Sequence, residues 1–203
     1  RLELSTLLGR VTKLGWSESD VHRKIIDDLT SFLDVSEEHC VIGLQVMVRL
    51  VGEMNTTTPT VRRSFTQSQS RKVALSFRDL LLLQIFNVSL STLAKLSAPP
   101  AHARLRLDSL NLALACLSYD FVGSSLDDSN EDIGTIHIPI SWHTVVEEPT
   151  TVKLFMDTYS ATCVADTDQS SKCIECLVQL ASMRRTLFAT DELRMINISR
   201  HMQ

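Results

Sequence analysis

The chain has 203 residues, a formal net charge of −4 at pH 7, 44% hydrophobic residues and only 5% aromatic residues. This length is enough for one domain with a hydrophobic core. The acidic balance excludes a generally basic surface for nucleic acid, and the leucine-rich, aromatic-poor composition favours packed helices over a β-sandwich.

The N-terminal residues predict two helices with a tight junction between them. Residues 2–13 carry a helical pattern that ends at Leu14-Gly15-Trp16, where Gly15 is expected to act as a left-handed C-cap. Ser17 to Asp20 has the pattern of a helix start, and apolar residues then repeat at helical spacing as far as Leu33.

A long apolar helix is expected to follow from Glu37 to Met54, with Ser36 as its cap. The link of Asp34 and Val35 is so short that this helix and the preceding one must be antiparallel neighbours. The polar residues 55–71 predict a flexible loop that contains Pro59.

Two further helix pairs are expected in the rest of the chain. One consists of residues 73–96 and 102–118, and the other of residues 150–163 and 169–188. Thr190-Asp191-Glu192 is expected to begin one more helix.

The long segment 119–149 interrupts this helical pattern and predicts an acidic insert loop. Residues 135–139 read as extended because they include β-branched residues and end at Pro139. A loop of this length inside an array of helices is uncommon and is often either functional or disordered.

A narrow polar stripe runs along four of the expected helices, whose other sides are almost wholly apolar. The stripes are Glu38, Gln45, Arg49 and Glu53; Gln84, Asn87, Ser91 and Lys95; Arg104, Asp108, Asn111 and Ser118; and Lys172, Glu175, Gln179, Ser182 and Thr186. Such helices must be covered on their other sides. They predict an all-α, HEAT- or armadillo-like right-handed superhelix of about three and a half helix pairs, in which a stripe on a second helix would line the concave surface.

Neither end of the chain carries a polar capping unit, which repeat arrays need at their termini. Arg1 begins within an apolar run and Gln203 ends within a charged helical pattern. We therefore expect residues 1–203 to be a single solenoid segment of a longer chain, with apolar surface at both ends.

Several short motifs, in this order and spacing, resemble the N-terminal half of the exportin-7 family over nearly the whole chain. They are Val11-Thr12-Lys13-Leu14-Gly15-Trp16, His39-Cys40-Val41-Ile42-Gly43, Ser76-Phe77-Arg78-Asp79, Tyr119-Asp120-Phe121-Val122-Gly123-Ser124-Ser125, Asp128-Ser129-Asn130-Glu131-Asp132, Ile138-Pro139-Ile140-Ser141-Trp142 and residues 176–188. The loop 55–71 and the linker at Pro99-Pro100 depart from the family's pattern. The resemblance implies a HEAT-repeat karyopherin of the importin-β superfamily, which carries cargo through nuclear pores under control of the GTPase Ran.

Two charged clusters are candidate partner-binding sites. The acidic cluster consists of Asp127, Asp128, Glu131 and Asp132. It is interpreted either as a solvated insertion or as a contact for a basic surface, which would speed encounter. The flanking residues Phe121, Ile136, Ile138 and Trp142 are expected to pin the insert to the helices.

The basic pair Arg184 and Arg185 stands at the end of a predicted helix. There it would either stabilise the helix C-terminus or contact an acidic partner or the acidic cluster itself.

The sequence offers little support for catalysis, a cofactor or a metal site. Cys173 and Cys176 lack a second cysteine pair or a suitably spaced histidine, so we expect them, with Cys40, Cys116 and Cys163, to be free thiols. His137, His143 and Asp132 could meet a metal ion, but their spacing does not require it. No nucleophile elbow or phosphate-binding loop is present, and the apolar run from Leu80 to Phe86 is too short to span a bilayer.

The chain is therefore expected to be a non-enzymatic segment of a nuclear transport receptor that binds Ran-GTP, protein cargo and nucleoporins and moves between nucleus and cytoplasm through the nuclear pore complex. The main alternative is a HEAT or armadillo scaffold unrelated to transport, which would not need the insert from Tyr119 to Trp142. A second alternative is an α-helical enzyme. Neither the cargo nor the direction of transport follows from the sequence.

Overall fold

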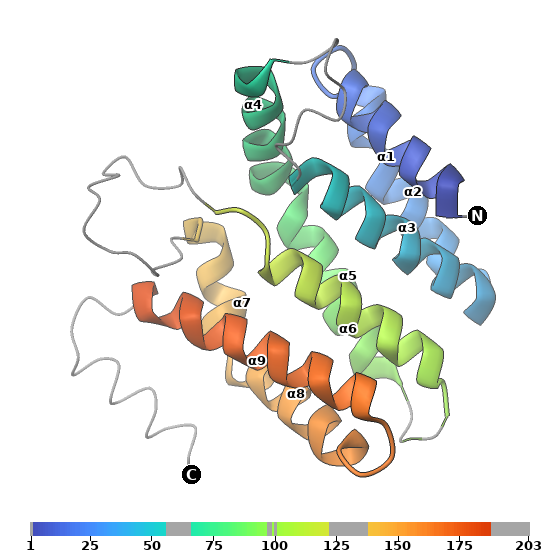
Figure 1. Cartoon of the computed structure of the whole chain (residues 1–203), viewed down its shortest axis with the longest axis vertical. Coiled ribbons are helices and arrows are strands. Elements are labelled where there is room, and N and C mark those ends of the chain that lie inside the picture. The colour runs from blue at the N-terminus through green and yellow to red at the C-terminus, as the bar shows by residue number, and fades with distance from the viewer. Residues whose placement is uncertain (1, 56–65, 97–98, 100, 122–137, 188–203) are drawn as a thin grey trace. The chain divides into compact units, whose positions relative to one another are not determined.

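The computed structural model describes residues 2–55, 66–96, 99, 101–121 and 138–187 (Figure 1). The chain divides into two compact units, Arg1–Tyr119 and Asp120–Gln203, which are described separately below. The described residues form helices and connecting turns, and none of them forms a strand. The prediction of an all-α, HEAT-like array is confirmed.

The first unit begins with the helices α1 (Leu2–Gly15), η1 (Asp20–Arg23), α2 (Ile25–Leu33) and α3 (Glu37–Asn55). The hairpin predicted for α2 and α3 is present, since these two helices pack on each other across a two-residue turn and its cap. Ser36 caps α3 as expected, because its hydroxyl accepts a hydrogen bond from the backbone N–H of His39 at 3.3 Å.

The junction after α1 differs from the prediction. Gly15 is the last residue of α1, and its φ lies outside the left-handed region. The glycine is needed for space instead, because a Cβ atom there would collide with the ring of His22. The single helix expected from Ser17 is divided into η1 and α2, and Ser19 is the residue whose side chain caps η1.

The second pair of this unit has one very long member. Helix α4 (Gln67–Phe77) continues through the π-helical segment η2 (Arg78–Leu82) into α5 (Leu83–Lys95), and α6 (Ala103–Leu117) packs along α5. The helix therefore begins inside the range 55–71 that the sequence predicted as a loop. A capping box accounts for this start, since Thr66 and Gln69 each bond the backbone N–H of the other.

By length and composition, the continuous helix Ser68–Lys95 is long and apolar enough to cross a membrane, with a mean hydropathy of 1.5 in its most apolar window. This helix is much longer than the apolar run from Leu80 to Phe86, which is too short by itself to span a bilayer. This criterion alone is weak support for a membrane span, because a core helix of a soluble protein also meets it. Ile85 and Phe86 of α5 are fully buried, whereas only 39% of that apolar window is buried.

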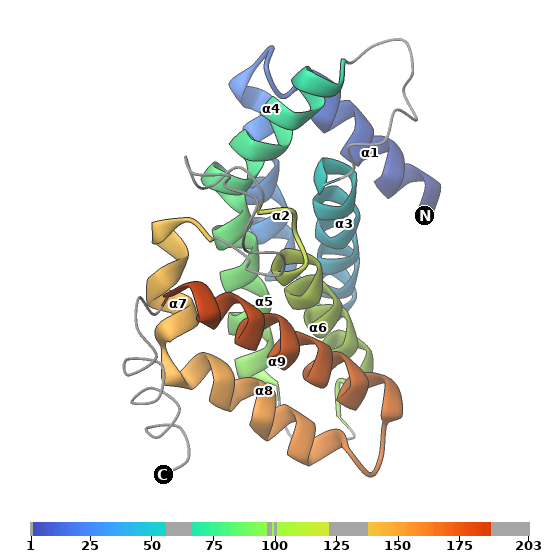
Figure 2. The same cartoon turned by 60° about the vertical axis from the view of Figure 1, so that its left-hand side comes forward.

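Helices α1, α3 and α6 form one row in which α3 packs on both of the others (Figures 1 and 2). All three helices run in the same direction. We call this arrangement the inner row, since α3 and α6 are the second helices of their pairs. The core of the unit includes Leu44 and Met47 of α3 and Leu110 of α6, which are fully buried.

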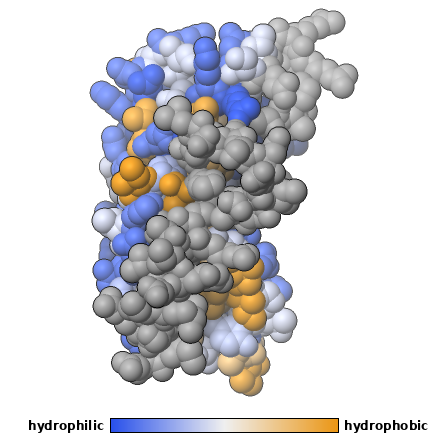
Figure 3. Space-filling model, turned by 90° about the vertical axis from the view of Figure 1, so that its left-hand side faces the viewer, coloured by the Kyte–Doolittle hydropathy of each residue, from blue (hydrophilic) through white to orange (hydrophobic). Residues whose placement is uncertain are grey.

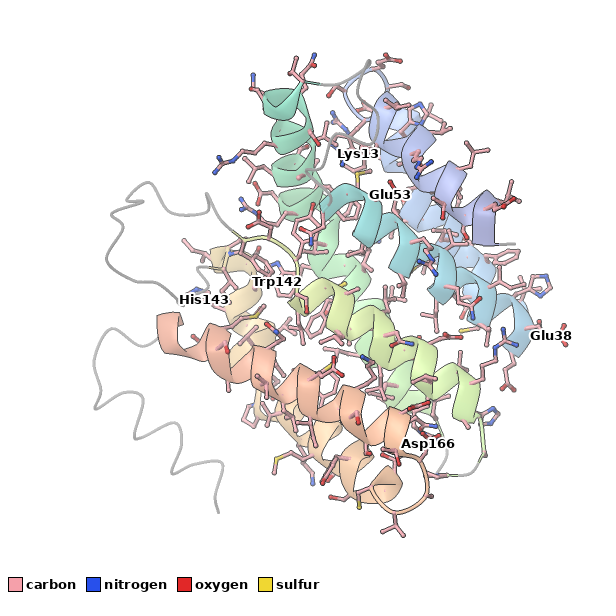
Figure 4. All side chains as sticks on the ribbon, in the orientation of Figure 1. Lys13, Glu38, Glu53, Trp142, His143 and Asp166 are labelled. Atoms are coloured by element: carbon pink, nitrogen blue, oxygen red, sulfur yellow. The ribbon has the colours of Figure 1, made fainter. Side chains whose placement is uncertain are left out.

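The second unit contains η3 (Ile140–Trp142), α7 (His143–Glu147), α8 (Pro149–Thr162) and α9 (Thr167–Leu187). Helices α8 and α9 pack together as the predicted third pair. Asp166 directly precedes α9 and caps its N-terminus (Figure 4). Its carboxylate accepts hydrogen bonds from the backbone N–H and the side-chain amide of Gln169, at 3.0 and 2.6 Å. The surface drawn in Figure 3 shows apolar side chains as separate patches among hydrophilic ones.

The segment 119–149 is partly helical, because η3 and α7 lie within the range expected as a loop. Phe121, Ile138 and Trp142 are buried as predicted, and the rings of Phe121 and Trp142 meet edge to face with their centroids 5.3 Å apart. Ile136 and the remainder of the expected acidic loop, residues 122–137, lie outside the described residues, as does the helix expected from Thr190.

Two glycines of α3 give a matched test of this packing. A Cβ atom on Gly43 would collide with the side chain of Leu33 on α2, whereas a Cβ atom on Gly52 would meet open space. We expect Gly43→Ala to lower the free energy of unfolding by about 1–3 kcal/mol through overpacking. Gly52→Ala should raise it by about 0.5–1 kcal/mol, because glycine in a helix interior is entropically unfavourable. Urea denaturation of both variants measures the difference, and equal effects would contradict this packing of α2 on α3.

Candidate functional site

An open groove of about 850 Å³ lies across the inner row. Its lining residues come from all three helices: Leu4, Ser5 and Leu8 of α1; Ile42, Gln45, Val46, Val48 and Arg49 of α3; and Arg104, Asp108, Asn111, Leu114, Ala115 and Ser118 from α6 and its C-cap. Because α3 packs on both α1 and α6, it forms the floor of the groove and they form its walls.

The groove combines two of the polar stripes that the sequence predicted. Gln45 and Arg49 are the middle of the α3 stripe, and the whole α6 stripe, from Arg104 to Ser118, lines the groove. Stripe residues repeat every three or four positions, so each stripe keeps to one side of its helix. Parallel packing of α3 and α6 then brings the two stripes face to face.

The two end residues of the α3 stripe, Glu38 and Glu53, are not among the lining residues of the groove. Glu53 lies beside α1, where its carboxylate is 3.6 Å from Arg10 and its backbone carbonyl accepts a hydrogen bond from Lys13 Nζ at 2.7 Å (Figure 4). Burial lowers the pKa of Lys13, and the charge of Glu53 partly opposes this shift. Glu38, at the other end of α3, is exposed. These contacts hold α1 against α3 and fix one wall of the groove.

A hydrogen bond between α3 and α6 crosses the groove, from Gln45 Nε2 to Asp108 Oδ2 at 3.0 Å. Burial raises the pKa of Asp108 above its ordinary value of 3.8, while the hydrogen bond from Gln45 and the charge of Arg104 act in the opposite direction. Arg49 and Arg104 are exposed, and neither forms an ion pair or hydrogen bond with another residue in the described part of the chain. The accessible charge in the groove is therefore predominantly positive.

Sequence reasoning missed the apolar lining residues of the groove, of which Leu4 and Leu8 are the two on α1. These two leucines stand one helical turn apart, and both are exposed on α1. Their spacing was visible in the sequence, but the apolar character of α1 on several sides concealed which face would remain open.

The residues predicted to bind partners are not part of this groove. Asp127, Asp128, Glu131 and Asp132 lie outside the described residues. Arg184 and Arg185 belong to the C-terminal part of α9, but the positions of their side chains are not described. Both clusters remain predictions.

The paired cysteines of α9 are core residues, as expected, and both are fully buried free thiols. Burial raises the pKa of Cys176 far above its ordinary value, which disfavours the reactive thiolate. His143 lies 3.7 Å from Glu147, one helical turn away. Among the described residues, no three histidine, cysteine or acidic side chains gather in a way that could hold a metal ion.

Residues from three motifs that carry the family resemblance meet in the core of the first unit. The indole N–H of Trp16 donates a hydrogen bond to Ser76 Oγ at 3.0 Å, and its ring packs edge to face on Phe77 with centroids 5.5 Å apart. Tyr119 packs against Phe77 and donates a hydrogen bond to the carbonyl of Ala74 at 3.0 Å. The motifs therefore preserve the packing between helix pairs.

Successive helix pairs with a parallel inner row and an open groove along it define a segment of an all-α, HEAT-like repeat protein. Comparisons place the chain more narrowly. It is 37% identical to exportin-7-A of Xenopus laevis and to Ran-binding protein 17 of Homo sapiens, and 38% identical to Ran-binding protein 16 of Drosophila melanogaster, each over 93% of its length. The chain is thus homologous to a segment of exportin-7 and Ran-binding proteins 16 and 17, as the resemblance indicated.

The chain spans only 18% of the length of each of these relatives. No family model matches it, and no solved structure matches it.

The environment of Asp108 predicts a measurable pH effect. A raised carboxyl pKa means that the folded protein binds the proton more tightly than the unfolded chain does. Ionisation of Asp108 should therefore destabilise the fold as the pH rises from about 3.8 through the raised pKa. Asp108→Asn should remove this effect, so its stability advantage over the wild type should grow across that window and then stay constant.

Denaturation at a series of pH values measures this advantage, and NMR titration of the Asp108 carboxyl checks its origin. Gln45→Ala should raise the pKa of Asp108 further, since it removes a hydrogen bond that favours the charged form. A pKa for Asp108 at or below the ordinary value would refute this account.

The cysteines should differ sharply in their reaction with iodoacetamide. Cys163 is exposed, whereas Cys40, Cys116, Cys173 and Cys176 are buried. In the folded protein, Cys163 should be modified first and the others only on unfolding, because alkylation needs an accessible thiolate. Mass spectrometry of samples taken over time measures the order of modification, with Cys163→Ser as control. Rapid modification of Cys176 in the folded protein would be incompatible with its burial.

Proposed function

We propose that this chain is a segment of a nuclear transport receptor that binds Ran-GTP together with protein cargo. The observation that carries the proposal is 37–38% identity, over 93% of the chain, to proteins named as an exportin and as Ran-binding proteins. The open groove along the inner row supports it, because repeat proteins of this class bind partners on such surfaces.

The proposed mechanism is linkage between partners. The polar links between neighbouring helices of the inner row include the hydrogen bonds from Lys13 to Glu53 and from Gln45 to Asp108. Small shifts at such interfaces add along an array of repeats. Ran-GTP and cargo would favour the same conformation of the array, so each would raise the affinity for the other, and GTP hydrolysis would reverse this effect.

The two charged clusters are proposed contacts within this function. Asp127, Asp128, Glu131 and Asp132 would attract a basic surface of Ran or cargo, and Arg184 and Arg185 would attract an acidic one. Passage between nucleus and cytoplasm through the nuclear pore complex, with contacts to nucleoporins, belongs to the same proposal.

A binding experiment with the full-length protein that contains this chain tests the function. Immobilised Ran is loaded with a non-hydrolysable GTP analogue or with GDP, and the affinity of the protein for each is measured by surface plasmon resonance. We expect preference for the GTP form and tighter binding when cargo is present. Equal affinity for the two nucleotide forms would instead favour a scaffold unrelated to transport.

Neutralising the acidic cluster should act mainly on association. We expect the combined change of Asp127, Asp128 and Asp132 to Asn and of Glu131 to Gln to slow the association of Ran-GTP or cargo, because the lost attraction is electrostatic. Added salt should shrink the difference from the wild type. Stopped-flow measurement at low and high salt gives these rates.

The matched control neutralises four exposed acids elsewhere: Glu18, Asp28, Glu38 and Asp168. Both variants should keep the stability of the wild type to within about 0.5 kcal/mol, since surface substitutions rarely change it more. If the acidic-cluster variant and the control associate at the same rates at low salt, the acidic cluster is a solvated insertion.

A further inference from the structure

We propose that the groove across α1, α3 and α6 binds an amphipathic helix of a partner protein that carries acidic residues beside its apolar face. The proposal rests on the proposed function in one respect, that the inner row is a binding surface. It adds that the partner segment bound by this surface is helical and acidic.

The apolar lining of the groove suits the apolar face of a helix. Leu4 and Leu8 expose 72% and 40% of their surface on the α1 wall, and they line the same groove as the apolar floor residues Ile42 and Val46. A partner helix that inserts apolar side chains at positions i, i+3, i+4 and i+7 would cover both leucines and reach this floor.

The length of the groove also matches a helix. Its α6 wall extends from Arg104 to Ser118, which at 1.5 Å per residue is roughly 21 Å. A helix of about four turns has this length. The floor residues are only half-buried by the surrounding chain, so a partner would remove them from water.

The two arginines set the charge and spacing of the partner. Arg49 lies one turn after Gln45, and Arg104 lies one turn before Asp108. Gln45 and Asp108 are hydrogen-bonded across parallel helices, so the two arginines stand on opposite sides of this bond, about 12 Å apart along the groove. Carboxylates two helical turns apart on a partner would therefore reach both guanidinium groups.

Asp108 offsets only part of this attraction, because the charged side chains among the described lining residues are two arginines and this one aspartate. One of its carboxylate oxygens also accepts a hydrogen bond from the amide of Gln45 at 3.0 Å. Arg49 and Arg104 are both exposed, and each carries a positively charged guanidinium group. A basic partner helix would thus face two cations, and an uncharged one would leave them without partners.

The test uses the full-length protein and three fluorescent synthetic peptides of about four helical turns, whose leucines repeat at helical spacing. The first peptide carries glutamates two turns apart, the second carries glutamine at those positions, and the third carries lysine. Fluorescence anisotropy gives the dissociation constants. We expect the glutamate peptide to bind at least about tenfold more tightly than the glutamine peptide, and the lysine peptide to bind least.

Variants of the groove assign this preference to the two arginines. The double variant Arg49→Gln/Arg104→Gln should bind the glutamate and glutamine peptides equally. The matched control Arg71→Gln/Lys72→Gln removes two exposed cations of α4 and should keep the preference of the wild type. Leu8→Gln should weaken binding of both peptides by a similar factor, whereas Val21→Gln, at an exposed site outside the groove, should not.

Three results would overturn the proposal: no binding of the glutamate peptide, equal binding of the glutamate and glutamine peptides by the wild type, or an unchanged preference in the double arginine variant. The nucleotide preference of Ran binding is measured on the same preparations. Loss of that preference with intact peptide selectivity would reject the transport function alone, and the reverse result would reject this proposal alone.

Discussion

A helix that is apolar on every side but one is stable in water only where neighbouring helices cover it. Helix α3 shows this constraint most clearly, because α2, α1 and α6 all pack on it. Leu44, Met47 and Val51 are consequently buried, while Gln45 and Arg49 line the open groove. The groove is the direct result, since it forms where coverage of the inner row stops.

The family resemblance was visible in the sequence because its motifs mark packing contacts. Trp16 and Ser76 are sixty positions apart, yet they are joined by one hydrogen bond. Gly43 permits the close approach of Leu33. Positions that make such close contacts accept few residue types, which favours recognition of a family from them. They identify the fold and the relatives, but apart from Ile42 the residues that line the groove come from other positions.

The helices and their pairing followed from the sequence because apolar periodicity reports which faces are covered. The errors lie at junctions, where local geometry decides. The start of α4 depends on the reciprocal hydrogen bonds of Thr66 and Gln69, and the role of Gly15 depends on where His22 is placed by the next turn.

The groove depends on the register between helices, which periodicity within one helix does not contain. The stripe residues Gln45 and Asp108 were identified, but nothing in the sequence shows that they face each other. The sequence signal for the charge of the groove was that the stripes on α3 and α6 each contain an arginine.

The π-helical segment η2 has a consequence for how the long helix of the first unit evolves. A π turn holds one residue more than an α turn, and each residue of an α-helix rotates the chain by about 100°. Deleting one residue within Arg78–Leu82 would allow a regular α-helix with nearly the same orientation of α4, whereas the present residues in regular α-helical geometry would turn α4 by about that angle relative to α5. Ser76 and Phe77 would then rotate away from Trp16 while Ile85 and Phe86 stayed in place. The π-helical segment thus sets the rotation of α4 relative to α5, so that one continuous helix packs against neighbours in two different directions.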